Sequence, residues 1–228
     1  MLPLVLIPGM MCDARMWGAP GELGRRMVVH AACTEYDTMP ALASAILADA
    51  PRRFALAGLS MGGIVAMEML RQAPERIERL ALLDTNPFAE QPEARARRQG
   101  QIDRALGGAL ASVMRDEMKP NYLAPGPGNI PVLDLCLAMA LALGPEVFAR
   151  QSRALRDRSD QSETLRSFRG PALVLLGRHD SLCPLQRHEA MQAMMPQARL
   201  AVIEGAGHLP TLEQPAATWA ELTRWLEA

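Results

Sequence analysis

The stretch from Phe54 to Gly63, FALAGLSMGG, constrains the fold more than any other part of the chain. An apolar run typical of a strand meets a serine bracketed by glycines, and an apolar helical pattern follows. In a sharp strand-turn-helix the serine is forced toward unfavourable backbone angles, and the positions two residues away must lack a bulky side chain. Gly58 and Gly62 meet that need. The turn predicts that the Ser60 hydroxyl stands clear of a sheet, beside the first amides of a helix, where a nucleophile would be placed.

Six short apolar runs alternate with helical patterns along the chain. They are residues 4–7, 27–31, 54–57, 80–83, 172–176 and 200–203. Their apolarity is continuous rather than alternating, which is typical of strands buried on both faces. We therefore predict an α/β fold with a mostly parallel sheet of about six strands, flanked by helices and joined by right-handed crossovers. Residues that carry chemistry should follow the carboxyl ends of these strands.

The alternation of strands and helices stops after the fourth apolar run and resumes at the fifth. Helical patterns fill the interval at residues 95–110, 111–119, 132–143 and 146–158, with prolines between them. A helical insertion between parallel strands would cover the strand ends as a lid. We therefore assign residues 1–85 and 168–228 to the core and residues 86–167 to a helical cap.

The predicted cap carries two kinds of side chain that could line a pocket. Its apolar members, which would suit an apolar roof, are Leu133, Leu137, Met139, Met114 and Met118. Its arginines recur at Arg95, Arg97, Arg98 and Arg104 and again at Arg150, Arg153, Arg156 and Arg158. A solvated helix face accounts for most such arginines, but one turned inward could hold a substrate carboxylate by a bidentate pair. The sequence does not say which arginine, if any, turns inward.

Two later strand ends each carry a titratable residue directly behind them. The fifth apolar run is followed by Arg178-His179-Asp180, and the sixth by Gly205-Ala206-Gly207-His208. The chain order Ser60, Asp180, His208 is the one expected where a serine elbow is completed by an acid and a base from later loops. We therefore predict a catalytic row of these three side chains. Asp84, which follows the fourth run, is a competing candidate for the acid.

The loop after the first predicted strand begins Pro8-Gly9-Met10, and its glycine permits a backbone amide to turn inward. The same space receives the first amide of the helix that follows the serine. We therefore predict that the Met10 and Met61 amides form a pair of oxyanion donors. Removing one such donor costs about 3 to 4 kcal/mol of transition-state stabilisation in other enzymes.

The segments Gly58-Leu59-Ser60-Met61-Gly62, Gly177-Arg178-His179-Asp180 and Gly205-Ala206-Gly207-His208 resemble the elbow, acid and histidine motifs of the α/β-hydrolase superfamily. The resemblance covers nearly the whole chain, with two departures. Pro8-Gly9 stands where the family usually has His-Gly, and the N-terminus is expected to be shortened by two strands. The resemblance implies neither a cofactor nor a metal.

The expected chemistry is acyl transfer to water through an acyl-enzyme on Ser60, with His208 as base and Asp180 orienting it. Our preferred substrate is a carboxylic ester with a small to medium apolar acyl group, and activity should rise as the histidine deprotonates, around pH ~6 to 7. A carbon-carbon bond hydrolase or lactonase of the aromatic-degradation type uses the same triad and is the alternative. A binding module or receptor on the same fold is the alternative that is not an enzyme.

Composition bears on partners and location. The chain is 49% apolar and 21% charged with a net charge of −1, so neither nucleic acid nor an anionic membrane surface is favoured as a partner. Residues 1–7 are too few for a signal peptide, and the longest later apolar run, 130–143, is shorter than a membrane span. Four scattered cysteines, Cys12, Cys33, Cys136 and Cys183, indicate reduced thiols rather than a disulfide framework. We expect a cytoplasmic protein, monomeric or a small homo-oligomer, that acts on a small-molecule ester or related acyl substrate.

Overall fold

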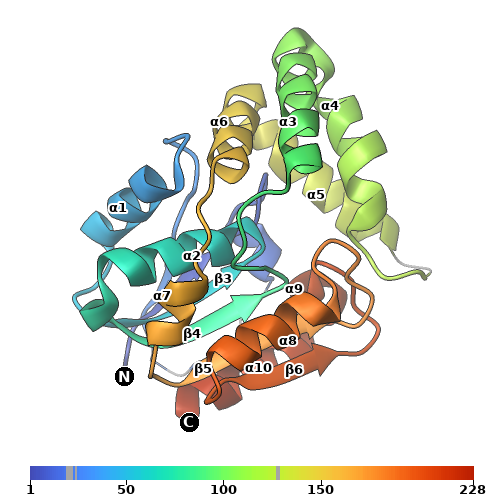
Figure 1. Ribbon diagram of the computed structural model, residues 1–228. Helices are drawn as coiled ribbons and strands as arrows, with labels where there is room; N and C mark the ends of the chain where they lie inside the picture. The colour runs from blue at the N-terminus through green and yellow to red at the C-terminus, as the bar shows by residue number, and fades with distance from the viewer. Residues whose placement is uncertain (19–22, 24, 127–128) are drawn as a thin grey trace.

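A computed structural model describes residues 1–18, 23, 25–126 and 129–228. At its centre six parallel strands form a sheet in the order β2-β1-β3-β4-β5-β6 (Figure 1). The strands are β1 Leu4–Ile7, β2 Val28–His30, β3 Phe54–Leu59, β4 Ile77–Leu83, β5 Ala172–Gly177 and β6 Arg199–Ile203. Each contains or overlaps one of the six apolar runs, so the predicted parallel α/β sheet is confirmed.

Side chains of each strand alternate between two apolar layers, which is why the strands read as continuous apolar runs. Val5 and Ile7 of β1 belong to one layer, and Leu4 and Leu6 belong to the other. The first layer is covered by α1 Met39–Asp49, α2 Met61–Gln72, α7 Ser162–Ser167 and α8 Leu185–Met194. The second is covered by η1 Ala14–Trp17, α9 Pro210–Glu213 and α10 Pro215–Glu227. A short turn of helix, η2 Pro74–Arg76, precedes β4.

A group of helices is inserted between β4 and β5 and lies together on one side of the molecule (Figure 1). Its members are α3 Pro92–Arg104, η3 Ala105–Ala109, α4 Leu110–Ser112, η4 Val113–Met118, η5 Lys119–Asn121, α5 Asn129–Leu143 and α6 Pro145–Arg156. The first break differs from the predicted one at residues 110 and 111, because Gly108 adopts the left-handed backbone (φ 92°) that favours glycine. Gly144 (φ 83°) separates α5 from α6 in the same way.

The helix α7 does not lie with the other inserted helices, although the predicted cap of residues 86–167 included it. It contacts α2 and α8, which cover the sheet (Figure 1). Leu165 of α7 is fully buried in the first apolar layer. We therefore propose that the cap ends before α7, with α3 to α6 as its body.

No single helix among the described residues is long and apolar enough to cross a membrane. The pair α5 and α6 reaches the required length and composition only when taken together, and the two helices are bent by 98° at the break between them.

Candidate active site

The serine elbow connects β3 to α2 and holds Ser60 in a strained conformation, φ 55° and ψ −117°. A Cβ atom at Gly58 would overlap the Gly62 carbonyl, and one at Gly62 would overlap the Ile7 carbonyl. The helix can therefore approach β3 and β1 this closely only because both positions are glycine. The close approach fixes the Ser60 side chain at the carboxyl end of the sheet.

Backbone strain is concentrated beyond the carboxyl ends of the strands. The non-glycine residues with positive φ among those described are Met11 (55°), Ser60 (55°) and Asp84 (44°). Each lies just beyond the end of a strand, β1, β3 and β4 respectively. Strain of about 1 to 3 kcal/mol per residue is typically found where a binding or catalytic site requires an unusual backbone.

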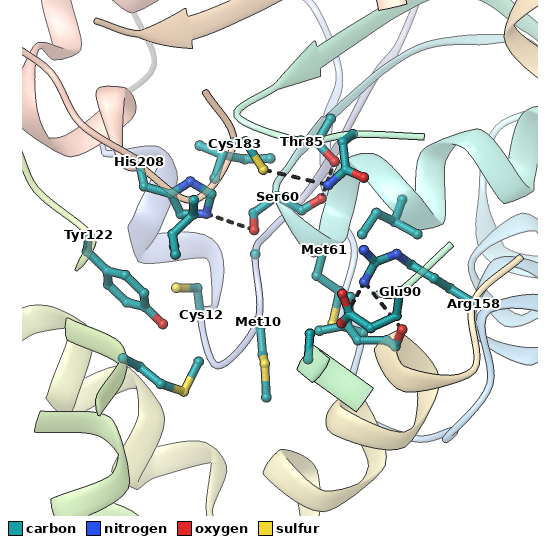
Figure 2. Close-up of a pocket in the computed structure, with 18 of the residues that line it drawn as sticks. Met10, Cys12, Ser60, Met61, Thr85, Glu90, Tyr122, Arg158, Cys183 and His208 are labelled. Carbon is teal, nitrogen blue, oxygen red and sulfur yellow. Dashed lines mark hydrogen bonds and ion pairs between the residues drawn. The ribbon is translucent and has the colours of Figure 1, made fainter. Parts of the chain in front are cut away.

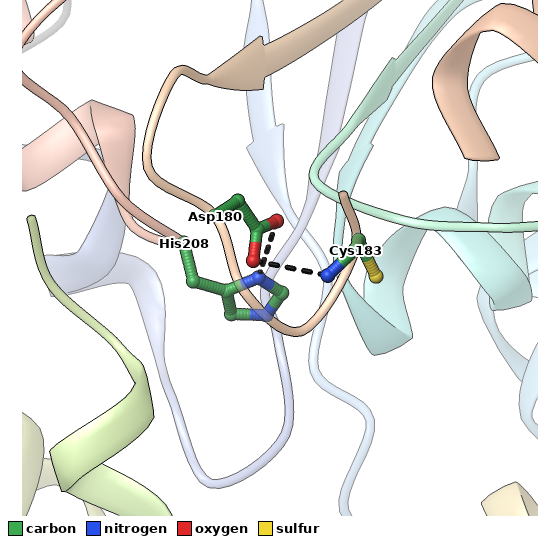
Figure 3. A group of neighbouring side chains, drawn as sticks. All are labelled: Asp180, Cys183 and His208. Atoms are coloured by element: carbon green, nitrogen blue, oxygen red, sulfur yellow. Dashed lines mark hydrogen bonds and ion pairs between the residues drawn. The ribbon is translucent and has the colours of Figure 1, made fainter. Parts of the chain in front are cut away.

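Three predicted site residues from three separate loops form a hydrogen-bonded row. His208 Nε2 lies 2.9 Å from Ser60 Oγ, and His208 Nδ1 lies 2.9 Å from Asp180 Oδ2 (Figures 2 and 3). Asp180 follows β5 and His208 follows β6, so the parallel sheet brings them to the end that carries the serine. Asp180 and His208 are both buried. The structure thus brings together the hydroxyl, imidazole and carboxylate of the three residues that the sequence singled out.

The surroundings of the Asp180 side chain favour its ionised form. Burial by itself would raise the pKa of its carboxyl, but the charge and hydrogen bond of His208 and the amides of Cys183 and Leu182 outweigh burial and lower that pKa to about 2. Both amides donate to Asp180 Oδ1, at 3.0 and 2.8 Å, which leaves Oδ2 for the imidazole. The carboxylate is therefore fixed in orientation as well as in charge.

Asp84, the competing acid, does not contact His208. Its side chain is fully buried, Oδ1 accepts a hydrogen bond of 2.9 Å from the Gly177 amide, and Oδ2 has no partner among the described residues. Burial, together with the charge of Asp180, raises the pKa of Asp84 well above its usual value. The pKa values of the two carboxyls at this end of the sheet are thus shifted in opposite directions, toward the ionised form of Asp180 and toward the neutral form of Asp84.

Asp84→Asn should make the protein more stable than the wild type, and increasingly so as the pH rises. The folded wild type holds a proton that the unfolded chain releases above pH ~4, so folding loses about 1.4 kcal/mol per pH unit until the folded-state pKa is reached. Asparagine carries no such proton. Free energies of unfolding from urea titrations between pH 4.5 and 8 measure the difference, with exposed Asp49→Asn as control. A gap that does not change with pH would mean that Asp84 is ionised in the folded state.

Met10 and Met61, whose amides are the predicted oxyanion donors, both lie near Ser60 (Figure 2). Met10 and Met61 both line the cavity in front of Ser60, and neither amide donates a hydrogen bond within the described part of the chain. Gln151 of α6 secures the loop that carries Met10. Its Oε1 accepts from the Met11 amide at 2.8 Å and its Nε2 donates to the Cys33 carbonyl at 2.7 Å. A cap side chain thus fixes the backbone of the loop that carries the predicted Met10 donor.

Gln151→Ala should destabilise the fold and slow turnover together. The side chain is almost completely buried, and its loss leaves two buried backbone groups unpaired, each costing about 1 to 3 kcal/mol. A loosened Met10 amide should also lower kcat by about 10-fold. Urea unfolding and steady-state kinetics measure the two effects, with exposed Gln186→Ala as control. Full stability with unchanged kcat would show that the loop holds itself in place.

The row opens into a cavity of about 290 Å³ between the sheet and the cap (Figure 2). Its apolar lining includes Met10, Met61, Ile64, Met118 and Leu155. Of the five side chains predicted for an apolar roof, Met118 is the one in this lining. Met114 and Met139 are instead buried in the apolar layers, where they pack helices rather than line the pocket. A regular apolar helix pattern does not distinguish a pocket roof from helix packing.

Charged side chains complete the cavity lining where the sequence had suggested an apolar roof. They are Glu90, Arg97, Arg98, Arg158 and Arg187, besides His208. Arg98 and Arg158 share the Glu90 carboxylate at 2.6 and 2.9 Å. Burial would raise the pKa of Glu90, but the two guanidinium groups hold it below its usual value. The side chains of Arg97 and Arg187 form no hydrogen bond or ion pair with any described residue. The cavity therefore carries an excess of positive charge.

Asp180, Cys183 and His208 offer ligand atoms within 4.8 Å of one another (Figure 3). The Asp180 oxygens and His208 nitrogens are already engaged in the hydrogen-bonded row described above. Burial raises the pKa of the Cys183 thiol to about 12, so it stays protonated rather than becoming the thiolate that a metal requires. The cluster is therefore part of the serine site and a poor metal site.

Three residues of the site were missed in the sequence. Gln151 and Glu90 lie in helix and loop sequence where no local pattern distinguishes them from surface residues. Arg187 lies in a helix outside the predicted cap. Its place in the first turn of the helix that begins after Pro184, seven residues beyond the predicted acid Asp180, was the one available hint for Arg187. The cap arginines that reach the cavity, Arg97, Arg98 and Arg158, were among the eight candidates.

Comparison with known proteins agrees with this fold. Residues 4–222 match the model of the alpha/beta hydrolase family, so the chain belongs to that family. It is 29% identical over 206 residues to a pimeloyl-[acyl-carrier protein] methyl ester esterase of Aromatoleum aromaticum, covering 78% of this chain and 76% of that protein. The protein is thus a hydrolase of the esterase-like kind, as predicted.

Solved structures give the same result. The chain is similar to a thermophilic esterase from Thermogutta terrifontis, solved with malate bound, with a TM-score of 0.86, 28% identity and coverage of 100% of this chain and 90% of the other. An enol-lactonase from Burkholderia xenovorans has a TM-score of 0.87 at 20% identity, covering 100% and 92%, and at that identity it shows the shared fold alone.

Proposed function

We propose that this hydrolase cleaves a carboxylic ester with a small to medium acyl group through an acyl-enzyme on Ser60. The observation that carries the proposal is the row Ser60–His208–Asp180, with two contacts of 2.9 Å at the floor of the cavity. The cavity of about 290 Å³ suits an acyl group of that size. Two relatives are named as methyl ester esterases, and these names support an ester as the substrate.

Each step of the reaction is assigned to one group. His208 Nε2 takes the Ser60 proton as the hydroxyl attacks the ester carbonyl, while Asp180 holds Nδ1–H and stabilises the imidazolium. The Met10 and Met61 amides donate to the oxyanion. His208 then gives its proton to the leaving alkoxide and afterwards activates the water that releases the acid.

The acyl or alcohol part of the preferred ester carries an anionic group. Four arginines and one glutamate line the cavity, and the guanidinium groups of Arg97 and Arg187 have no hydrogen bond or ion pair among the described residues. A carboxylate or phosphate on the substrate would supply the missing charge by bidentate hydrogen bonds. This refines the sequence prediction, which favoured a purely apolar acyl group and left an acidic substrate as an alternative.

A matched pair of methyl esters tests this preference. Monomethyl adipate and methyl hexanoate have the same chain length and differ in the terminal carboxylate. We expect kcat/KM to be about 10- to 100-fold higher for the half-ester, the value of one or two charge-assisted hydrogen bonds. Arg187→Gln should remove most of that advantage, whereas exposed Arg166→Gln on α7 should keep it. Equal rates on the two esters would refute the anionic preference without touching ester hydrolysis itself.

A lactone in the same panel tests the alternative reaction. No described feature of the cavity favours carbon-carbon bond or lactone cleavage over ester cleavage. Turnover of a five- or six-membered lactone that exceeds that of every linear ester by more than about 10-fold, a difference of 1.4 kcal/mol, would replace the ester proposal. The released acid is measured by pH-stat for all substrates.

A further inference from the structure

Glu213 of α9 joins the His208 loop to a segment of the cap. Its Oε1 accepts hydrogen bonds from the amides of Gly207 and Leu209, at 2.9 and 3.0 Å. Its Oε2 accepts from Gly207 at 2.9 Å and from Ala124 at 2.7 Å. One carboxylate therefore binds the amides on both sides of His208 and an amide of the chain between η5 and α5.

The two stretches of backbone that Glu213 joins are also in direct contact. The His208 amide donates to the Tyr122 carbonyl at 2.6 Å, and the two rings lie 6.1 Å apart. A Cβ at Gly207 would lie 2.6 Å from the Ala124 nitrogen, closer than real side chains come. On the opposite side, a Cβ at Gly177 would overlap the Gly207 carbonyl. The His208 loop is thus held between the end of β5 and residues 122–124.

No cation balances this carboxylate, since Glu213 forms no ion pair within the described part of the chain. Backbone amides satisfy it instead, as a concave set of N–H dipoles satisfies an anion. Such an arrangement depends on all three amides pointing inward at once. If residues 122–124 move away, the carboxylate loses the Ala124 donor and His208 loses its own bond to Tyr122.

We propose that Glu213 is a positioning residue that orients His208 and couples it to cap residues 122–124. The proposal rests on the proposed function only in taking His208 as the base for Ser60. Because Glu213 fixes residues 207 and 209, it sets the backbone from which the imidazole reaches both Ser60 and Asp180. Docking of residues 122–124 and alignment of the His208 imidazole then depend on the same contacts.

Glu213→Gln is the first test, because it keeps the size of the side chain and changes one oxygen into a donor. The amide nitrogen would face backbone N–H donors, so at least one bond must break. We expect kcat to fall by about 10- to 100-fold, the effect of a misplaced catalytic group, with KM within about threefold. Labelling of Ser60 by a fluorophosphonate should slow by the same factor. Exposed Glu189→Gln is the matched control and should change neither rate.

Ala124→Pro removes one donor to Glu213 and leaves the glutamate in place. We expect a smaller loss than for Glu213→Gln, and little further loss when the two are combined, because both break the same contact. If the losses of kcat from the two substitutions multiply in the double variant, the proposed coupling to the cap is refuted. A Glu213→Gln protein with a lowered melting temperature but an unchanged kcat and labelling rate would show a purely structural role and overturn the proposal.

The labelling rate separates this proposal from the proposed function. Wild-type protein that reacts with the fluorophosphonate at Ser60 but hydrolyses no ester would refute the substrate class, while the effect of Glu213→Gln on labelling would still decide the role of Glu213. If the protein hydrolyses esters but the labelling rate does not depend on Glu213, the proposed function is supported and the positioning role of Glu213 is refuted.

Discussion

Ser60→Ala should lower kcat on any ester by about 10⁴- to 10⁶-fold, as removal of the nucleophile does in other serine hydrolases, and should leave the fold intact. Among the described residues the hydroxyl forms one hydrogen bond, to His208 Nε2 at 2.9 Å. The strain at this position is a property of the backbone, φ 55°, and alanine would adopt the same angles at a similar cost. The loss therefore reports chemistry rather than stability.

Circular dichroism and urea unfolding establish that the Ser60→Ala protein is folded, and exposed Ser44→Ala serves as the control for the substitution itself. Turnover is followed with aryl esters of increasing acyl length, which also measures the size of the cavity. Fluorophosphonate labelling should disappear in Ser60→Ala and persist in Ser44→Ala. A folded Ser60→Ala protein that keeps most of the esterase rate would end the case for an acyl-enzyme on this serine.

Asp180→Asn should lower kcat by about 10⁴-fold, as loss of the triad carboxylate does elsewhere. Asp180 Oδ2 accepts from His208 Nδ1 at 2.9 Å, which leaves Nε2 unprotonated and able to accept the proton of Ser60. The asparagine amide can instead donate to Nδ1, which selects the tautomer with a proton on Nε2. That imidazole cannot act as the base. Steady-state kinetics at pH 7.5 give the magnitude of the effect.

The comparison with Asp84→Asn decides between the two carboxyls at this edge of the sheet. Asp84 contacts the Gly177 amide and not His208, and burial favours its neutral form, which asparagine resembles in shape and charge. We expect Asp84→Asn to retain kcat within a few-fold, set against the ~10⁴-fold loss for Asp180→Asn. The opposite pattern, a dead Asp84→Asn and a tolerant Asp180→Asn, would move the acid to β4.

Much of the site could be predicted from the sequence because its signals are local. Continuous apolar runs identified the strands. Because parallel strands place their carboxyl ends together, Ser60, Asp180 and His208 were expected at the same end of the sheet. The requirement for Gly58 and Gly62 follows from the spacing of two residues on either side of the serine. Each of these signals is complete within about ten residues of chain, the scale at which periodicity can be read.

The cap was predicted less well for an equally physical reason. Prolines and helical periodicity marked the inserted helices, but the break at Gly108 and the separate packing of α7 depend on contacts with the core. An arginine-rich helix looks the same whether one guanidinium points inward or all point to solvent. Burial of Glu90 between Arg98 and Arg158 is what turns two of these side chains toward the cavity.

The sequence by itself determined the α/β sheet and the glycine-flanked turn at Ser60, and it placed Asp180 and His208 at the same end of the sheet as the serine, because strand burial and glycine spacing act over a few neighbouring residues. Only the tertiary structure decided that burial raises the pKa of Asp84 while His208 lowers that of Asp180, that the Arg97 and Arg187 side chains line the cavity without a partner among the described residues, and that Glu213 reaches Ala124. These features arise where segments distant in the chain pack against each other, and hydrogen bonds and charges formed there leave no periodic trace in either segment.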